Sequence, residues 1–174
     1  TIFFFFFKEH DIGGQLIVMN NLLTTDMIKD KIIFFQIKKS PQHIEGGNEW
    51  RAELMRILLP KNTDLIKEKF KSERIGMIGS SRWLITDEKQ CYHFLQPELL
   101  QLCGFCGMNN IESKNFGFIG GTMFIVKGKI YRDFFTKNNP LKIRDLLTST
   151  AYAHAAERLL GFIVLDAGYA IKGI

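Results

Sequence analysis

The sequence predicts an α/β fold in a single domain, and three observations indicate that class. The chain has 174 residues, a length typical of one domain with a substantial core. Short, continuous apolar runs, rich in the 16 phenylalanines, are typical of buried strands. Segments with apolar residues at three- and four-residue steps lie between these runs and predict helices. We therefore expect a central, mostly parallel sheet flanked by helices.

The predicted elements begin with a buried strand at residues 1–7, a helix that runs to Leu23 despite Gly13 and Gly14, and a second buried strand at residues 31–38. Strand, helix and strand in this order favour a right-handed βαβ unit. A polar loop is expected at residues 40–48. The later elements are helices at 49–59, after 62, at 97–102, at 141–147 and at 151–161, an amphipathic segment at 130–135, and strands at 75–78, 116–126 and within 167–173.

The chain begins without methionine, directly in a strand-like run, so we expect residues 1–174 to be one domain from a longer chain that lacks the first elements of its fold. Residues 1–7 have neither a basic leader nor a cleavage site, which argues against a signal peptide. No apolar segment reaches 18 residues, so no transmembrane segment is expected in this part of the protein.

The net charge of +5 favours an anionic partner. The lysines are scattered and form no block of five or six like charges, so a small phosphorylated ligand suffices to explain them. The aromatic residues occur in apolar runs and not between basic residues, which argues against a nucleic-acid partner.

Three cysteines, Cys91, Cys103 and Cys106, are an odd number and do not suggest a secreted disulfide framework. Cys103 and Cys106 form a Cys-x-x-Cys spacing within an apolar run. No second cysteine pair or neighbouring histidine accompanies them, so buried free thiols are favoured over a zinc or redox site.

Ligands of open α/β sheets bind beyond the carboxyl ends of the strands, and three predicted loops qualify. The first, residues 8–14, contains His10 and Asp11 before two glycines whose backbone amides favour an anion. Asp11 could bind ribose or sugar hydroxyls or a metal, or it could cap the following helix.

The second loop, residues 38–51, contains Lys38, Lys39 and Arg51, which suit a diphosphate as counter-charges. The two lysines could equally reach solvent along their own side chains. Trp50 is interpreted as a core residue and not as a stacking platform. The third loop contains Gly120 and Gly121, which indicate a bulge, a close contact with a sugar ring, or tight helix packing.

The helix at 151–161 carries a polar stripe at helical spacing, composed of His154, Glu157, Arg158 and Gly161. It lies opposite an apolar face made by Tyr152, Ala155, Ala156, Leu159 and Ile163. The stripe combines a base, an acid and a permanent cation, and it could form part of a site or a solvated helix face. The sequence contains no Walker A motif, Gly-x-Gly-x-x-Gly, Gly-x-Ser-x-Gly, His-Glu-x-x-His or Asp-x-Asp.

Four segments in order resemble the rhamnan synthesis F family of bacterial polysaccharide clusters and some large-virus glycosyltransferases. Residues 8–14, KEHDIGG, are similar to its Gly-Arg-Asp-Ile-Gly turn, and residues 37–41, IKKSP, followed by Trp50 and Arg51, to its His-Thr-Lys-Lys-Ser…Trp-Arg stretch. Residues 118–124, FIGGTMF, are similar to Phe-x-Ala-Gly-Thr-Met-Phe, and residues 153–161, AHAAERLLG, to Ala-His-Ala-x-Glu-Arg-Leu-x-Gly. Gln36 stands where the family has histidine, and Ser149 lies near an expected aspartate.

The resemblance implies a GT-A-like fold and a hexosyltransferase or rhamnosyltransferase. Such an enzyme transfers sugar from a UDP- or dTDP-linked donor to a glycan acceptor, with Mn²⁺ or Mg²⁺ as a possible cofactor. It also implies a cytoplasmic protein, associated with a membrane, if at all, through other parts of the chain.

The same resemblance implies roles for individual residues. Lys38, Lys39 and Arg51 would bind the diphosphate, and Asp11 the donor sugar or nucleotide. Glu157 would be the general base, with His154 as an alternative base or a metal ligand. The remaining substrate-binding candidates are His10, Gly13, Gly14, Gln36, Trp50, Gly120, Gly121, Thr122 and Arg158.

Two other functions remain open from the sequence. A catalytically degenerate module that binds glycan or acts as a scaffold is favoured by Gln36, Ser149 and the missing Asp-x-Asp. A nucleic-acid binder is suggested only by the charge.

Overall fold

The computed structural model describes residues 11–35, 47–86, 96–108 and 116–174. The α-helices are α1 (Asp11–Thr24), α2 (Gly47–Leu54), α3 (Thr63–Lys71), α5 (Gln96–Phe105), α6 (Gly128–Lys137), α7 (Pro140–Asp145) and α8 (Thr150–Asp166). The 3₁₀ helices are η1 (Met55–Leu58), η2 (Pro60–Asn62) and η3 (Ser81–Trp83). The strands are β1 (Lys31–Phe34), β2 (Ile75–Gly79), β3 (Leu84–Ile85), β4 (Phe118–Ile119), β5 (Phe124–Lys127) and β6 (Ala170–Gly173).

The protein has an α/β fold built on a mixed sheet with the strand order β1-β5-β2-β6. β5 is antiparallel to both of its neighbours, whereas β2 and β6 are parallel. β1, β2 and β6 therefore run in one direction, and β5 runs against them. The mostly parallel pairing that the sequence predicts is wrong for the described strands. β5 is antiparallel to β2 because it begins at the end of the sheet where β2 finishes, with Phe124 opposite Gly79. The predicted strand at residues 1–7 lies outside the described residues, so the βαβ unit remains a prediction.

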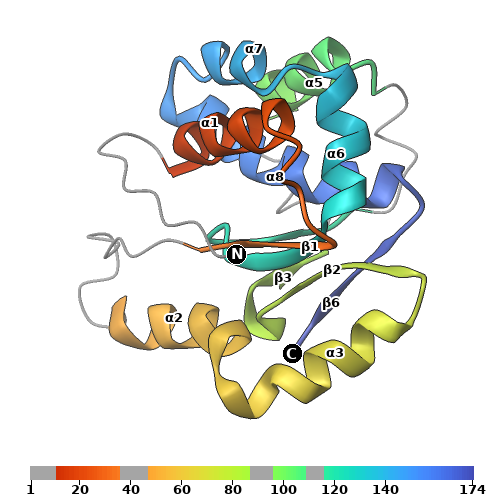
Figure 1. The fold of residues 1–174 in the computed structure, drawn as a ribbon. Coiled ribbons are helices and arrows are strands. Elements are labelled where there is room, and N and C mark those ends of the chain that lie inside the picture. The colour runs from red at the N-terminus through yellow and green to blue at the C-terminus, as the bar shows by residue number, and fades with distance from the viewer. Residues whose placement is uncertain (1–10, 36–46, 87–95, 109–115) are drawn as a thin grey trace.

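Helices cover both faces of the sheet (Figure 1), with α1, α5, α6, α7 and α8 on one side and α2 and α3 on the other. Consecutive strand residues point to opposite faces, which divides the core in two. On β5, Phe124 and Val126 belong to the large cluster beneath α8 and α6, whereas Ile125 packs with Ile66 and Phe70 of α3. Burial on both faces accounts for the continuous apolar sequence of this strand.

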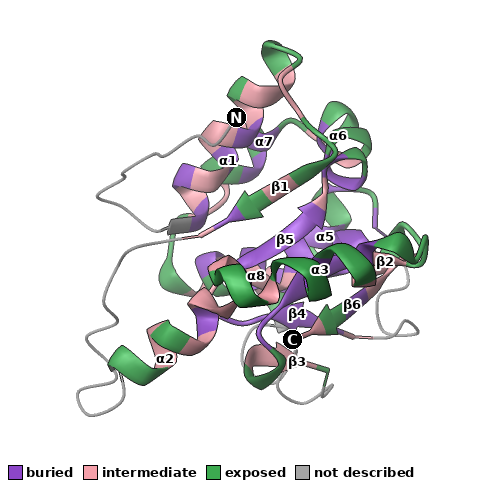
Figure 2. Ribbon diagram, turned by 60° about the horizontal axis from the view of Figure 1, so that its bottom comes forward, coloured by how far each residue is buried: buried purple, intermediate pink, exposed green. Residues whose placement is uncertain are grey.

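β1 differs from the buried strand predicted at residues 31–38. Among the described strands it lies at the edge of the sheet, and only Phe34 of its four residues is fully buried, whereas 41% of Ile33 is exposed. Figure 2 shows this contrast between β1 and the buried centre of the sheet. The apolar sequence could not distinguish an edge from a central position, because both are compatible with the same residues.

The single strand predicted at 116–126 is two strands in two different sheets. β4 pairs with β3 in a separate ladder, and β5 belongs to the main sheet. Residues Gly120–Thr122 form the turn between them, and Gly121 and Thr122 both have positive φ. The two glycines therefore change the direction of the chain and do not form a bulge within one strand.

Helix α8 is longer than the predicted 151–161 and is buried along most of its length. Ser149, near the position where the resembled family has an acid, is its N-cap and accepts a hydrogen bond from the Tyr152 amide at 3.4 Å. Gly161, expected on the polar stripe, is buried against β4. Since α8 packs against the sheet and also against α1, α5 and α6, more than one of its faces is apolar.

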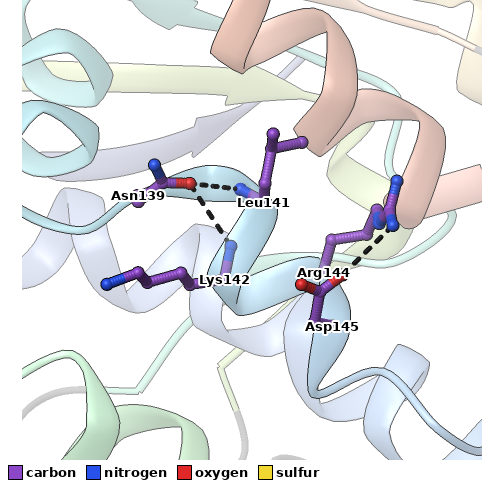
Figure 3. A network of polar contacts seen from close by, with 5 residues as sticks. All are labelled: Asn139, Leu141, Lys142, Arg144 and Asp145. Atoms are coloured by element: carbon purple, nitrogen blue, oxygen red, sulfur yellow. Dashed lines mark hydrogen bonds and ion pairs between the residues drawn. The ribbon is translucent and has the colours of Figure 1, made fainter.

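The short helix α7 begins with a well-defined cap, drawn in Figure 3. The Asn139 carboxamide oxygen accepts hydrogen bonds from the amides of Leu141, at 2.8 Å, and Lys142, at 3.3 Å. Pro140 occupies the first helical position, where the missing amide hydrogen has no intrahelical partner to lose. α7 packs on α1, so this cap fixes the support beneath the first described helix.

None of the described helices combines the length and apolar character that crossing a bilayer requires.

Gly161 in α8 and Gly104 in α5 should respond oppositely to alanine. A Cβ on Gly161 would lie 2.2 Å from the Gly117 carbonyl oxygen and 2.7 Å from Phe118 Cα, whereas a Cβ on Gly104 meets nothing within 4 Å. We expect Gly161→Ala to lower the free energy of unfolding by about 1–3 kcal/mol through overpacking. Gly104→Ala should raise it by up to about 1 kcal/mol through helix propensity. Urea denaturation measures both, and stabilisation by both variants would contradict the close packing of α8 on β4.

Candidate functional site

The candidate site lies at the end of the sheet where the strands β1, β2 and β6 finish. Phe124, the first residue of β5, pairs with the last residues of β1 and β2, which are Phe34 and Gly79. Gly79 also pairs with Gly173 at the end of β6. The turn Gly120–Thr122, which we call the glycine turn, comes immediately before this point. It therefore lies where ligands of α/β proteins bind, beyond the carboxyl ends of the strands.

The glycine turn has a strained backbone. Gly121 has φ +82° and Thr122 has φ +49°, and Thr122 is buried with 3% of its surface exposed. A β-branched residue in the left-handed region costs on the order of 1–3 kcal/mol and persists only when its surroundings enforce it. Four other segments of the chain, which are α8, α1, α2 and the segment that contains Trp83, contact this turn and supply that constraint.

The shortest of these contacts comes from helix α8. The Gly121 amide donates a hydrogen bond of 2.6 Å to Oε1 of Glu157, whose side chain is 14% exposed. A hydrogen bond between a carboxylate and an amide, largely shielded from water, is stronger than one between neutral groups. Gly161 lies one helical turn after Glu157, and its lack of a side chain allows α8 to approach β4 closely enough for this bond.

The two neighbours of Glu157 on the predicted stripe are arranged differently from each other. Arg158 is 15% exposed; its guanidinium lies 4.7 Å from the centre of the Phe118 ring and donates to the His154 carbonyl oxygen at 2.8 Å. His154 is 55% exposed, and its Nδ1 lies 3.9 Å from Glu157 Oε2. The stripe is therefore not a solvated face, since only His154 is largely exposed.

Helix α1 contacts the turn through Gln15. Its Nε2 donates to the Thr122 carbonyl oxygen at 3.4 Å. Among the sequence-predicted residues of this segment, Asp11 is the first residue of α1, Gly14 is buried, and Gly13 faces the Arg144 side chain of α7. Gln15 was not predicted, because a glutamine inside a helix carries no signal of a contact with a turn more than 100 residues away.

Helix α2 closes the other side of the turn. A Cβ on Gly121 would lie 2.6 Å from Leu54 Cδ1 and 3.0 Å from Trp50 Cζ2. Trp50 is half-buried and packs edge-to-face on Trp83, with ring centres 6.2 Å apart. Trp83 in turn accepts a hydrogen bond from the Gly120 amide on its carbonyl oxygen, at 2.9 Å. Trp50 thus packs beside the glycine turn and is half-buried. Its prediction as a core residue did not indicate this position.

The structure brings some of the predicted site residues together and leaves others apart or undescribed. The glycine turn itself contains Gly120, Gly121 and Thr122. Trp50 and Glu157 contact it, and Arg158 and His154 lie beside Glu157. Arg51 follows Trp50 in α2 and is half-buried. His10, Gln36, Lys38 and Lys39 lie outside the described residues. Within residues 11–35, 47–86, 96–108 and 116–174, no cluster of three or more His, Cys, Asp or Glu side chains could hold a metal.

The chemistry available here centres on the Glu157 carboxylate. Its Oε1 is occupied by the Gly121 amide, whereas Oε2 lies 3.9 Å from both His154 Nδ1 and Arg158 Nη1. One carboxylate can thus orient the turn through one oxygen and accept a proton or a hydroxyl hydrogen bond through the other.

The chain was compared with protein-family models, with curated proteins and with solved structures, and none of the three comparisons found a match.

Cys103 and Cys106 are buried free thiols, as predicted, while Cys91 lies outside the described residues. Burial raises the pKa of Cys103 to about 12 and that of Cys106 to about 11.

We expect the thiols of Cys103 and Cys106 to resist iodoacetamide at pH 8 in the native protein and to react in urea, as measured by mass spectrometry. Because the unfolded thiols deprotonate at lower pH than the native ones, their contribution to stability should be lost as pH rises above about 8.5. Rapid native labelling would contradict their burial.

Gly121 and Gly168 form a matched pair for testing the packing around the glycine turn. Their φ values are +82° and +81°, but a Cβ on Gly168 meets nothing within 4 Å. Alanine should therefore cost both positions the same backbone strain, about 1–2 kcal/mol. Gly121→Ala should lose a further 1–3 kcal/mol, approximately, because Leu54 and Trp50 occupy the space. Equal losses in urea denaturation would show that these side chains do not crowd the turn.

Proposed function

We propose that this protein is a glycosyltransferase that moves a hexosyl or rhamnosyl group from a UDP- or dTDP-linked donor to a hydroxyl of a glycan acceptor. The observation that carries the proposal is a convergence. Three of the four segments that resemble the rhamnan synthesis F family contribute described residues at the glycine turn, namely Trp50, the turn itself and Glu157, and the first segment, residues 8–14, is followed directly by Gln15, which contacts Thr122. Segments separated by more than 100 residues meet at the sheet edge where nucleotide ligands commonly bind.

In this proposal the donor lies across the sheet edge, with the diphosphate near Lys38, Lys39 and Arg51. Positive side chains neutralise the charge that develops on the leaving diphosphate. Asp11 contacts the donor sugar or nucleotide, and a divalent cation, Mn²⁺ or Mg²⁺, if held by Asp11 or His154, would supply positive charge to the diphosphate. The glycine turn lines the sugar position, since its glycines present backbone in place of side chains.

Glu157 is proposed as the general base for the acceptor hydroxyl. Its Oε1 is fixed by the Gly121 amide, so the carboxylate has a defined orientation before the acceptor binds. Oε2 remains to take the proton as the hydroxyl oxygen attacks the sugar carbon. His154, exposed and 3.9 Å from Oε2, is the alternative base or could receive the proton from Glu157.

The second candidate is a degenerate module that binds glycan without transferring sugar. The Glu157–Gly121 hydrogen bond favours it, because the bond also has a purely structural explanation as a support for a strained turn. Ser149 is the N-cap of α8, and the resembled family has an acid near this position, which also favours the degenerate module. Binding of sugar without turnover would distinguish this candidate from the enzyme.

The enzymatic proposal predicts that the protein binds UDP- or dTDP-sugars by isothermal titration and consumes them when Mn²⁺ and a glycan acceptor are present. Glu157→Gln keeps an oxygen for the Gly121 amide but removes the base. We expect it to retain donor binding within a few-fold and to lose roughly 10²–10⁴-fold in transfer rate. Glu68→Gln is the matched control, because Glu68 is an exposed residue of α3, and it should change neither quantity.

Two results would count against this assignment. Nearly full transfer by Glu157→Gln, with loss of transfer in Asp11→Asn, would show that Glu157 is not the base. Absence of any binding of nucleoside-diphosphate sugars, with and without metal, would exclude the enzyme class for residues 1–174.

A further inference from the structure

Two buried polar groups in the segment after β2, beside the glycine turn, have no hydrogen-bond partner in the described part of the chain: the Ser80 hydroxyl and the Trp83 indole N–H. The Oε1 atom of Gln15, in α1, is a third unpaired group near this turn. Ser80 is fully buried. Folding removes such groups from water without replacing the lost hydrogen bonds, so native proteins retain few of them, and each calls for an explanation. A ligand that supplies the missing partners is one explanation, and an ordered water is another.

Both groups lie at the sheet edge that carries the candidate site. Ser80 directly follows Gly79, the last residue of the central strand β2, and the Trp83 amide donates to the Ser80 carbonyl oxygen at 3.2 Å. Trp83 is joined to the glycine turn by the hydrogen bond from Gly120 to its carbonyl oxygen. A Cβ on Gly120 would lie 3.8 Å from Trp83 Cε3, so the indole is in close proximity to the turn.

The hydrogen-bonding chemistry of the two groups determines which ligand could pair with them. An indole N–H only donates, whereas a serine hydroxyl both donates and accepts. Their partner must therefore offer at least one acceptor and can also offer a donor, as sugar hydroxyls do. The neighbouring Trp50 and Trp83 rings add apolar faces, against which the C–H face of a pyranose packs well.

We infer that Ser80 and Trp83 bind hydroxyl groups of the transferred sugar and determine which sugar the site accepts. This inference rests on the proposed function and adds two residues to it. A site that hydrogen-bonds a substrate hydroxyl discriminates strongly against an analogue without it, because its own buried groups are then left unpaired. Both polar atoms are closed off from solvent in the ligand-free protein, so the sugar reaches them after a side-chain movement.

The test uses Ser80→Ala and Trp83→Phe, which remove the polar groups and retain most of the packing. Ligands are UDP- and dTDP-linked hexoses and rhamnose, the corresponding deoxy-sugars, UDP and dTDP alone, and free rhamnose- and glucose-containing oligosaccharides. Binding is measured by titration calorimetry and by intrinsic fluorescence, since Trp50 and Trp83 are the two tryptophans of the chain. Thermal unfolding of each variant reports whether it remains folded.

We expect each variant to weaken binding of sugar-containing ligands by about 5- to 100-fold while binding of UDP or dTDP alone is unchanged. Ser80→Ala should not be less stable, because it loses an unpaired polar group, whereas Trp83→Phe should lose stability only through the indole packing that it removes. On wild-type protein, one of the deoxy-sugars should show a similar loss, a result that does not depend on the folding of any variant.

The inference is overturned if both variants bind sugar-containing ligands as wild type does, or if no sugar-containing ligand binds. It is also overturned if Ser80→Ala loses stability without losing affinity, since the hydroxyl would then bind an ordered water. The proposed function fails separately. If nucleotides and nucleotide sugars do not bind but free oligosaccharides bind and depend on Ser80 and Trp83, the sugar site stands and the transferase does not.

Discussion

The hydrogen bond between the Gly121 amide and Glu157 is the constraint on which the candidate site depends. It joins the turn before the central strand β5 to helix α8, and it crosses 36 positions of sequence. The bond requires α8 to lie very close to β4, which Gly161 permits by having no side chain. It also requires two consecutive residues with positive φ, one of them the buried Thr122. Helix packing, turn geometry and the orientation of the carboxylate are therefore features of one arrangement.

The existence of most described helices and strands could be predicted from the sequence, because burial imposes a period on the residues. The strand at 75–78 and the helix at 151–161 follow directly from that pattern. Two properties of the sheet do not follow from this pattern, and each has a physical reason. The direction of β5 depends on where the preceding chain returns to the sheet, and the exposure of Ile33 depends on β1 having no described neighbour on one side. Neither property changes which residues a strand prefers.

For the site, the sequence indicated Gly121 and Glu157 separately but not their hydrogen bond. The glycine pair interrupted an apolar run, and the acid lay on a polar stripe, so each had a local signal. Gln15, Ser80 and Trp83 had none, since a helical glutamine, a serine after a strand and a tryptophan in a short 3₁₀ helix are all ordinary in isolation. Their importance comes from contacts across the fold, which a single sequence does not encode in any short window.

Hydrogen exchange at the Gly121 amide is the most direct measurement of the central claim, that Glu157 fixes the glycine turn. In the wild-type protein this amide should exchange slowly. Glu157→Ala should accelerate it by roughly 10- to 100-fold, the loss expected for a hydrogen bond to a charged group, while the amides of β2 keep their protection. An equal exchange rate at Gly121 in the two proteins would contradict the claim, because the amide would then have no bond to Glu157 to lose.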